Sequence, residues 1–74
     1  MPKFKPGDFV RMTKTSLKNT TNQRWADEHG YLWLVTGYDY DGDVVCKSLA
    51  TGATERTNGG KFWFRSNELE KADA

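Results

Sequence analysis

Residues 31–49 read YLWLVTGYDYDGDVVCKSL, and this stretch decides the fold. Its first half is rich in β-branched and aromatic residues, which favour strands. The Asp-Gly pair at 41–42, flanked by apolar residues, is typical of a tight hairpin turn. The stretch therefore predicts one strand over residues 31–40 and a returning strand over residues 43–49. Gly37, inside the first of these strands, indicates a bulge or a sharp bend.

The segment before this hairpin predicts a further strand. A Pro-Gly turn signal at residues 6–7 precedes residues 8–13, in which polar and apolar side chains alternate. A strand here places Val10 and Met12 on one face and Phe9 and Arg11 on the other.

Residues 14–30 lose this alternation and are mostly polar. We expect a long first loop that contains a short helical turn, because long loops in small domains usually carry a function or some structure. Thr21 or Asn22 is the candidate cap of the turn, Trp25 its apolar anchor, and Gly30 its end.

After the hairpin, Thr51-Gly52 marks a second turn. One further strand is predicted from residues 53–57 and 61–65, interrupted by Asn58-Gly59-Gly60, which form a third turn or a bulge. Phe62 and Phe64 lie on one face of it and Trp63 on the other. Residues 66–69 predict one helical or 3-10 turn that inserts Leu69 into the end of the core, and a short end strand follows.

Length and composition fit a single β-rich domain over residues 1–74. The chain is only 36% hydrophobic but 14% aromatic, so a few large rings supply much of a small core. Five short strands with a long first loop and tight later turns predict an all-β barrel, because closing the sheet removes most exposed strand edges.

This layout resembles the SH3-like barrels of small bacterial and phage-type domains. The resemblance is carried by KPGDFVR at residues 5–11, GYDYDG at residues 37–42 and FRSNELE at residues 64–70. It implies a five-stranded SH3-like barrel with a 3-10 turn before the last strand. Members of this group bind proteins, RNA or DNA, or serve as accessory subunits, so the resemblance leaves the function open.

The charges are segregated along the chain although the net charge is only +1. Residues 1–25 hold six basic side chains and one acidic one, whereas residues 26–45 hold five acidic side chains and no Lys or Arg. Such a chain could present one basic and one acidic face, or its charges could be interspersed in space and only keep it in solution.

Several features favour a reduced, cytoplasmic location. Cys46 is the single cysteine, so no internal disulfide can form, and we interpret it as a small core residue. The N-terminus lacks the apolar segment of a signal peptide. The longest apolar run, residues 31–35, is far below the roughly 20 residues of a membrane span, so we expect no membrane partner.

Three alternating carboxylates, Asp39, Asp41 and Asp43, resemble the start of a calcium-binding loop. Such a loop needs glycine at its sixth position and a bidentate glutamate at its twelfth. Here the glycine is at the fourth position, Gly42, and the twelfth is Ala50. We therefore interpret the segment as a solvated acidic hairpin tip and expect no metal.

No residue set reaches the standard of a catalytic motif. His29 is the single histidine and has Cys46 or Asp27 as possible partners, but a nucleophilic thiol needs an exposed, electropositive setting. A phosphate-binding loop at residues 59–61 is rejected because a strand, not a helix, is predicted to follow it. We expect a protein that is not an enzyme and uses no cofactor.

The remaining function is binding. We expect a protein-binding module, by analogy a phage or bacterial regulator that docks on a larger protein machine. Its cleft would lie between residues 24–29 and residues 38–41, where aromatic and charged side chains combine as they do in interfaces. The contact residues expected are Trp25, Tyr38, Tyr40 and Trp63, with the two tyrosines on a shared face; the alternative for Trp25 is that it closes the end of the core.

The alternative function is binding of RNA or DNA. Aromatic rings beside basic side chains are how small barrels bind single strands. The basic residues that would contact phosphates lie in the N-terminal third: Lys3, Lys5, Arg11, Lys14, Lys18 and Arg24. The sequence pI of about 7.9 is below the strongly basic value of a dedicated nucleic-acid binder, which argues against this alternative.

Overall fold

The central hairpin is formed by β2 (Leu32–Tyr38) and β3 (Val44–Ser48) in the computed structural model, which describes residues 3–55 and 60–72. The predicted bulge is confirmed, because the register of the two strands shifts between Val35 and Gly37. The predicted tight turn is also confirmed: Gly42 adopts a φ of 85°, a left-handed conformation that favours glycine.

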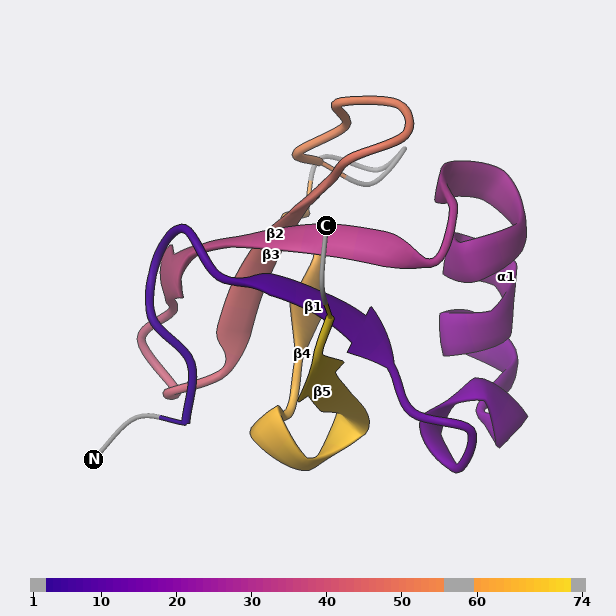
Figure 1. Cartoon of the computed structure of the whole chain (residues 1–74), viewed down its shortest axis with the longest axis horizontal. Coiled ribbons are helices and arrows are strands. Elements are labelled where there is room, and N and C mark those ends of the chain that lie inside the picture. Colours follow the sequence, from indigo (N-terminus) through magenta and orange to yellow (C-terminus); the bar gives the residue numbers. More distant parts are fainter. Residues whose placement is uncertain (1–2, 56–59, 73–74) are drawn as a thin grey trace.

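Five antiparallel strands make one sheet in the order β4-β3-β2-β1-β5 (Figure 1). The outer strands of this order are β4 (Trp63–Phe64) and β5 (Leu69–Lys71), and β1 (Phe9–Met12) lies between β2 and β5. As predicted, Val10 and Met12 are buried and Phe9 and Arg11 are exposed.

The predicted closed barrel is not confirmed. In the described parts of the chain β4 pairs with β3 and β5 pairs with β1, but β4 and β5 do not pair with each other. The strand material expected over residues 61–65 is reduced to the two residues of β4. A 3-10 turn, η2 (Ser66–Glu68), then redirects the chain, which confirms the turn expected before the last strand.

Of the strand material expected over residues 53–57, the described part is residues 53–55, in which only Glu55 pairs with another strand residue. Glu55 and Lys61 form an isolated bridge, and Gly52, with a φ of 72°, makes the second predicted turn. Part of the expected third turn, Asn58 and Gly59, lies outside the described residues.

The first loop contains more helix than the sequence suggested. A 3-10 turn, η1 (Ser16–Lys18), leads into helix α1 (Thr20–His29) of ten residues. The cap is Asn19, whose Oδ1 accepts hydrogen bonds from the backbone N–H groups of Thr21 and Asn22, so the expected caps at those two positions were wrong. The fold is therefore mostly, not purely, β-sheet.

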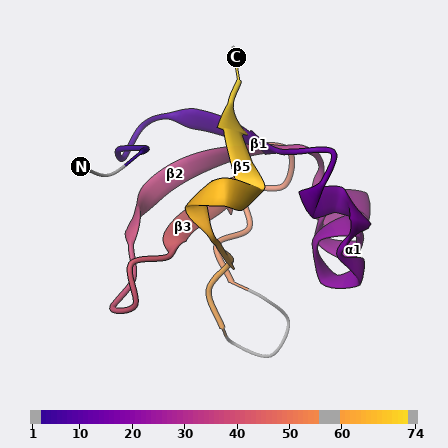
Figure 2. The same cartoon turned by 90° about the horizontal axis from the view of Figure 1, so that it is seen from below.

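Helix α1 stands beside the sheet (Figure 2). Its Trp25 and Ala26 belong to the buried apolar cluster. The Trp25 ring meets Phe62 and Phe64 edge-on, at centroid distances of 5.1 and 5.3 Å. Leu69 is buried, as predicted, and Phe62 and Phe64, which were predicted to share a face, are both buried. The complete buried apolar cluster consists of Phe4, Val10, Met12, Trp25, Ala26, Trp33, Val35, Val44, Cys46, Phe62, Phe64 and Leu69.

Within the described part of the chain, neither length nor apolar character makes any helix a candidate to cross a membrane.

A candidate binding pocket between helix α1 and strand β4

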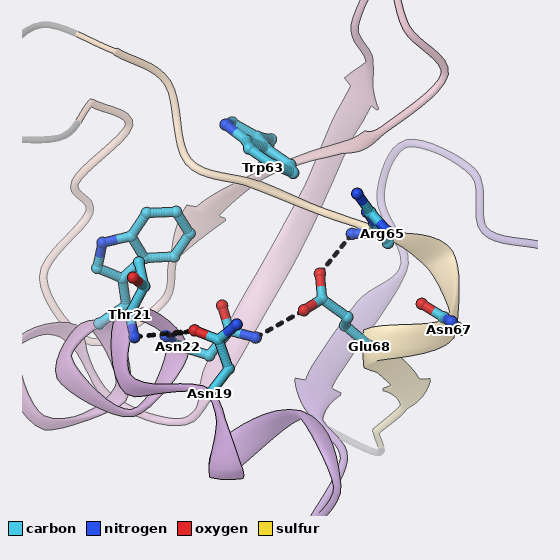
Figure 3. A pocket seen from close by; sticks show the side chains of 8 residues that line it. Asn19, Thr21, Asn22, Trp63, Arg65, Asn67 and Glu68 are labelled. Atoms are coloured by element: carbon cyan, nitrogen blue, oxygen red, sulfur yellow. Dashed lines mark hydrogen bonds between the residues drawn. The ribbon is translucent and has the colours of Figure 1, made fainter.

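A pocket of about 570 Å³ opens between α1 and the corner formed by β4 and η2 (Figure 3). This volume is within the usual range of roughly 300–1,000 Å³ for binding pockets. Its lining combines two indole rings with amides and two opposite charges: Asn19, Thr21, Asn22, Trp25, Trp63, Arg65, Asn67 and Glu68.

The helix side of the pocket follows from the helical spacing. Asn22 and Trp25 are three residues apart, so they lie on the same face of α1, and both are buried. Asn22 is only 5% exposed. Its Nδ2 atom donates one hydrogen bond to the backbone oxygen of Ser16, at 3.2 Å, and another to Glu68, at 2.8 Å.

Glu68 joins the two sides of the pocket. Its Oε2 atom accepts the hydrogen bond from Asn22, and its Oε1 atom accepts one from the backbone N–H of Arg65, also at 2.8 Å. The hydrogen bond from Asn22 connects Glu68 to helix α1, and the one from Arg65 connects it to the residue that follows β4. One carboxylate therefore fixes the distance between α1 and η2 (Figure 3).

The hairpin tip adds negative charge near Arg65. Val44 pairs with Phe64, so the register places Asp43 next to Arg65 across the two strands. Burial raises the pKa of Asp43, and the charges of Asp39 and Asp41 raise it further, whereas Arg65 acts in the opposite direction. Arg65 is thus a cation beside the acidic hairpin.

Two of the four expected contact residues, Trp25 and Trp63, line this pocket. Trp25 is 8% exposed and belongs mainly to the core, which is the alternative considered for it. Trp63 is 37% exposed and points away from Phe62 and Phe64, as predicted. Trp63 therefore carries most of the aromatic surface that the pocket offers to a ligand.

The two tyrosines lie outside this pocket lining, and they do not behave as a pair. The Tyr38 hydroxyl donates to the backbone oxygen of Phe4 at 2.6 Å and accepts from its N–H, whereas Tyr40 is fully exposed. The shared face was expected from strand alternation, but β2 ends at Tyr38 and the turn begins there. The pocket also joins α1 to β4 and η2, not to the hairpin at residues 38–41 as expected.

The six basic residues of the alternative function are exposed, and none of them lines the pocket. They come from separate elements: the segment before β1, strand β1, the region of η1, and α1. Arg11 forms an ion pair with Glu70, with Nε 3.5 Å from Oε1. The structure therefore does not join these residues to the exposed indole of Trp63.

Sequence reasoning missed the polar half of the pocket. Asn22 and Glu68 are 46 residues apart, and no local pattern connects them. One signal was present: Asn22, Trp25, Ala26 and His29 follow the spacing of one helix face, so an asparagine on that face needs a polar partner.

The hairpin brings Asp39, Asp41 and Asp43 together, with carboxylate oxygens within 4.8 Å of one another, and these are residues that could hold a cation. The Oδ1 atom of Asp39 already accepts hydrogen bonds from the backbone N–H groups of Asp41 and Asp43 and so shapes the turn.

The thiol of Cys46 is buried, which raises its pKa to about 12. The ring of His29 hydrogen-bonds through Nδ1 to the hydroxyl of Thr51 at 3.2 Å. An activated thiol nucleophile needs a lowered pKa, and the pKa of Cys46 is raised. The partner of His29 is the Thr51 hydroxyl, not this thiol.

No family model, no curated protein and no solved structure matches this chain.

Proposed function

We propose that this chain is a small, non-catalytic protein-binding module whose pocket between α1 and β4 receives a segment of a partner protein. The observation that carries the proposal is Trp63, a large ring that is 37% exposed at the edge of a formed pocket. Tryptophan and arginine are the side chains most enriched among residues that dominate binding energy, and Arg65 lies beside Trp63 in the pocket lining.

The rigidity of the pocket supports the same proposal. Glu68 holds α1 and η2 together by hydrogen bonds before any ligand arrives. Trp25 is held in place by its ring contacts with Phe62 and Phe64. A preformed site loses less conformational entropy on binding, which favours affinity.

Charge favours a protein segment over nucleic acid. A site for single-stranded nucleic acid needs several cations along the strand as well as stacking rings. Arg65 is the one basic side chain among the described residues that line the pocket, and Glu68 lies in the same pocket. A phosphate backbone passing Trp63 would therefore meet a carboxylate as well as a guanidinium.

Selection from a displayed library of random peptides, about 12 residues long, tests the proposal. Wild-type protein is immobilised, and selected peptides are then measured against Trp63→Ala and Tyr31→Ala. Tyr31 is a suitable control because it is an aromatic residue, 56% exposed, outside the pocket lining. We expect Trp63→Ala to weaken binding at least about tenfold and Tyr31→Ala to leave it unchanged.

Circular dichroism verifies that both variants are folded. Peptides that bind folded Trp63→Ala as well as wild type would reject the pocket as the site. A parallel titration with fluorescent single-stranded RNA and DNA at about 50 mM salt covers the other function. Binding there that falls steeply with salt, and with substitution of the N-terminal basic residues, would assign the protein to nucleic acid.

A further inference from the structure

The pocket contains a carboxylate whose charge is not neutralised. Both oxygens of Glu68 accept hydrogen bonds from neutral donors, the amide of Asn22 and the backbone N–H of Arg65. In the described part of the chain, the ion pairs that form do not include Glu68. Glu68 is half-buried, so its charge is screened less than that of an exposed carboxylate.

Arg65 does not cancel this charge, because it lies among several carboxylates. Asp43 is its neighbour across the strands, and Asp39 and Asp41 lie within 4.8 Å of Asp43. Both Arg65 and Glu68 act on the pKa of Asp43, so all these groups belong to one electrostatic neighbourhood. Among the described residues, Asp43 and the charged groups that act on its pKa are four carboxylates and one guanidinium, so their balance is negative.

The exposed ring of Trp63 adds a second property that points to a cation. Trp63 and Glu68 line the same pocket, and the ring lies across the pocket from Asn22 and Asn19 (Figure 3). The face of an indole attracts a Lys ammonium or an Arg guanidinium through its quadrupole. An aromatic face and a carboxylate in one pocket both favour the same kind of group.

We propose that the partner segment is basic, and that one of its lysine or arginine side chains binds between the ring of Trp63 and the carboxylate of Glu68. Further basic residues of the segment lie toward Asp41 and Asp43 on the hairpin. This inference rests on the proposed function, because it names the chemistry of the segment that the pocket receives. Glu68 would repel an acidic segment. A neutral segment would remove water from the Glu68 carboxylate without supplying a charge to compensate for the lost hydration.

The peptides selected above supply the first test. We expect Lys and Arg to be enriched over the unselected library, and Asp and Glu to be depleted. A selected basic peptide, labelled with fluorescein, is then titrated by anisotropy against Glu68→Gln, Asp41→Asn and Asp27→Asn. Asp27 is the matched control because it carries the same charge on α1, two residues from Trp25, and so faces away from that side of the helix.

We expect affinity to fall about tenfold in Glu68→Gln, which loses the charge nearest the ligand, and about threefold in Asp41→Asn. Asp27→Asn should bind like wild type. Raising the salt concentration should weaken binding to wild type more than binding to Glu68→Gln, because screening removes part of the same attraction. That difference would not arise if Glu68 only shaped the pocket.

The contrary outcomes separate this inference from the proposed function. Selected peptides that depend on Trp63 but show no basic enrichment, or an acidic one, would overturn the inference and leave the function standing. Basic peptides that bind Glu68→Gln and Asp41→Asn as tightly as wild type would also overturn it. A selection that yields no peptide dependent on Trp63 would reject both.

Discussion

Replacing Glu68 by alanine should destabilise the fold more than the half-buried position of its side chain suggests. The substitution removes the acceptor of Asn22, whose amide is 2.8 Å away, and the acceptor of the Arg65 N–H, also at 2.8 Å. Arg65 is exposed, so water can replace the second bond. Asn22 is 5% exposed and keeps only the weaker bond to Ser16 at 3.2 Å.

Hydrogen bonds to charged groups contribute about 1.5–3 kcal/mol each when they are buried. The hydrogen bond from Asn22 should contribute its full value, whereas water replaces the one from Arg65. We therefore expect Glu68→Ala to lower the free energy of unfolding by about 2 kcal/mol. For a domain of this size the melting temperature should fall by roughly 10 °C. Urea unfolding followed by tryptophan fluorescence measures the free energy directly.

Glu70→Ala is the control for this measurement. Glu70 is two residues away and pairs with Arg11 at 3.5 Å, but its side chain is 46% exposed. An exposed ion pair contributes less than about 1 kcal/mol, so this variant should remain close to wild type. Equal losses in the two variants would refute the reasoning. So would strict additivity of Glu68→Ala and Asn22→Ala, because two residues in direct contact should couple.

Three further predictions concern the hairpin and the core. Burial, and then the two neighbouring aspartates, raise the pKa of Asp43 above its ordinary value of 3.8, so its contribution to stability is lost as the pH rises from that value through the folded-state pKa. Asp43→Asn should therefore have a larger free energy of unfolding in urea than wild type at pH 7. An advantage of the variant that persists unchanged below pH 3 would contradict this. Cys46, buried and with a pKa of about 12, should react with a thiol reagent at pH 8 only after unfolding, so rapid labelling of the native protein would count against the core position. Gly42→Ala should lower the free energy of unfolding by about 1–2 kcal/mol, because Gly42 has a φ of 85°. Gly37→Ala should leave it almost unchanged in the same assay, because Gly37 has no positive φ and nothing is within 4 Å of the added Cβ.

The parts of the fold that local chemistry determines were predictable. The Asp-Gly turn, the bulge at Gly37 and the alternation of Val10 and Met12 each depend on a few adjacent residues. The start of α1 was misplaced because Asn19 was not recognised as the cap, although asparagine is among the best capping residues. The closure of the sheet was overestimated, because strand length near β4 depends on tertiary packing.

The candidate site was only half predictable, for a different reason. Trp25 and Trp63 attract attention as large rings in a small polar chain. Their polar companions do not, because an asparagine in a helix and a glutamate in a turn are ordinary until the fold brings them together. The bond between Asn22 and Glu68 is a product of topology, and no local pattern encodes it.

The open sheet and the pocket are two aspects of one structural feature. β4 pairs only with β3 in the described residues, and its buried side chains, Phe62 beside it and Phe64 within it, are covered by Trp25 from α1. The helix therefore shields a part of the core that a closed sheet would shield with a strand. A helix contacts a strand through side chains, not through a ladder of backbone hydrogen bonds. Space therefore remains between α1 and β4, and this space is the pocket. Trp63, on the opposite face of β4, borders the same gap, which explains why it remains exposed in a chain that has few large side chains to spare.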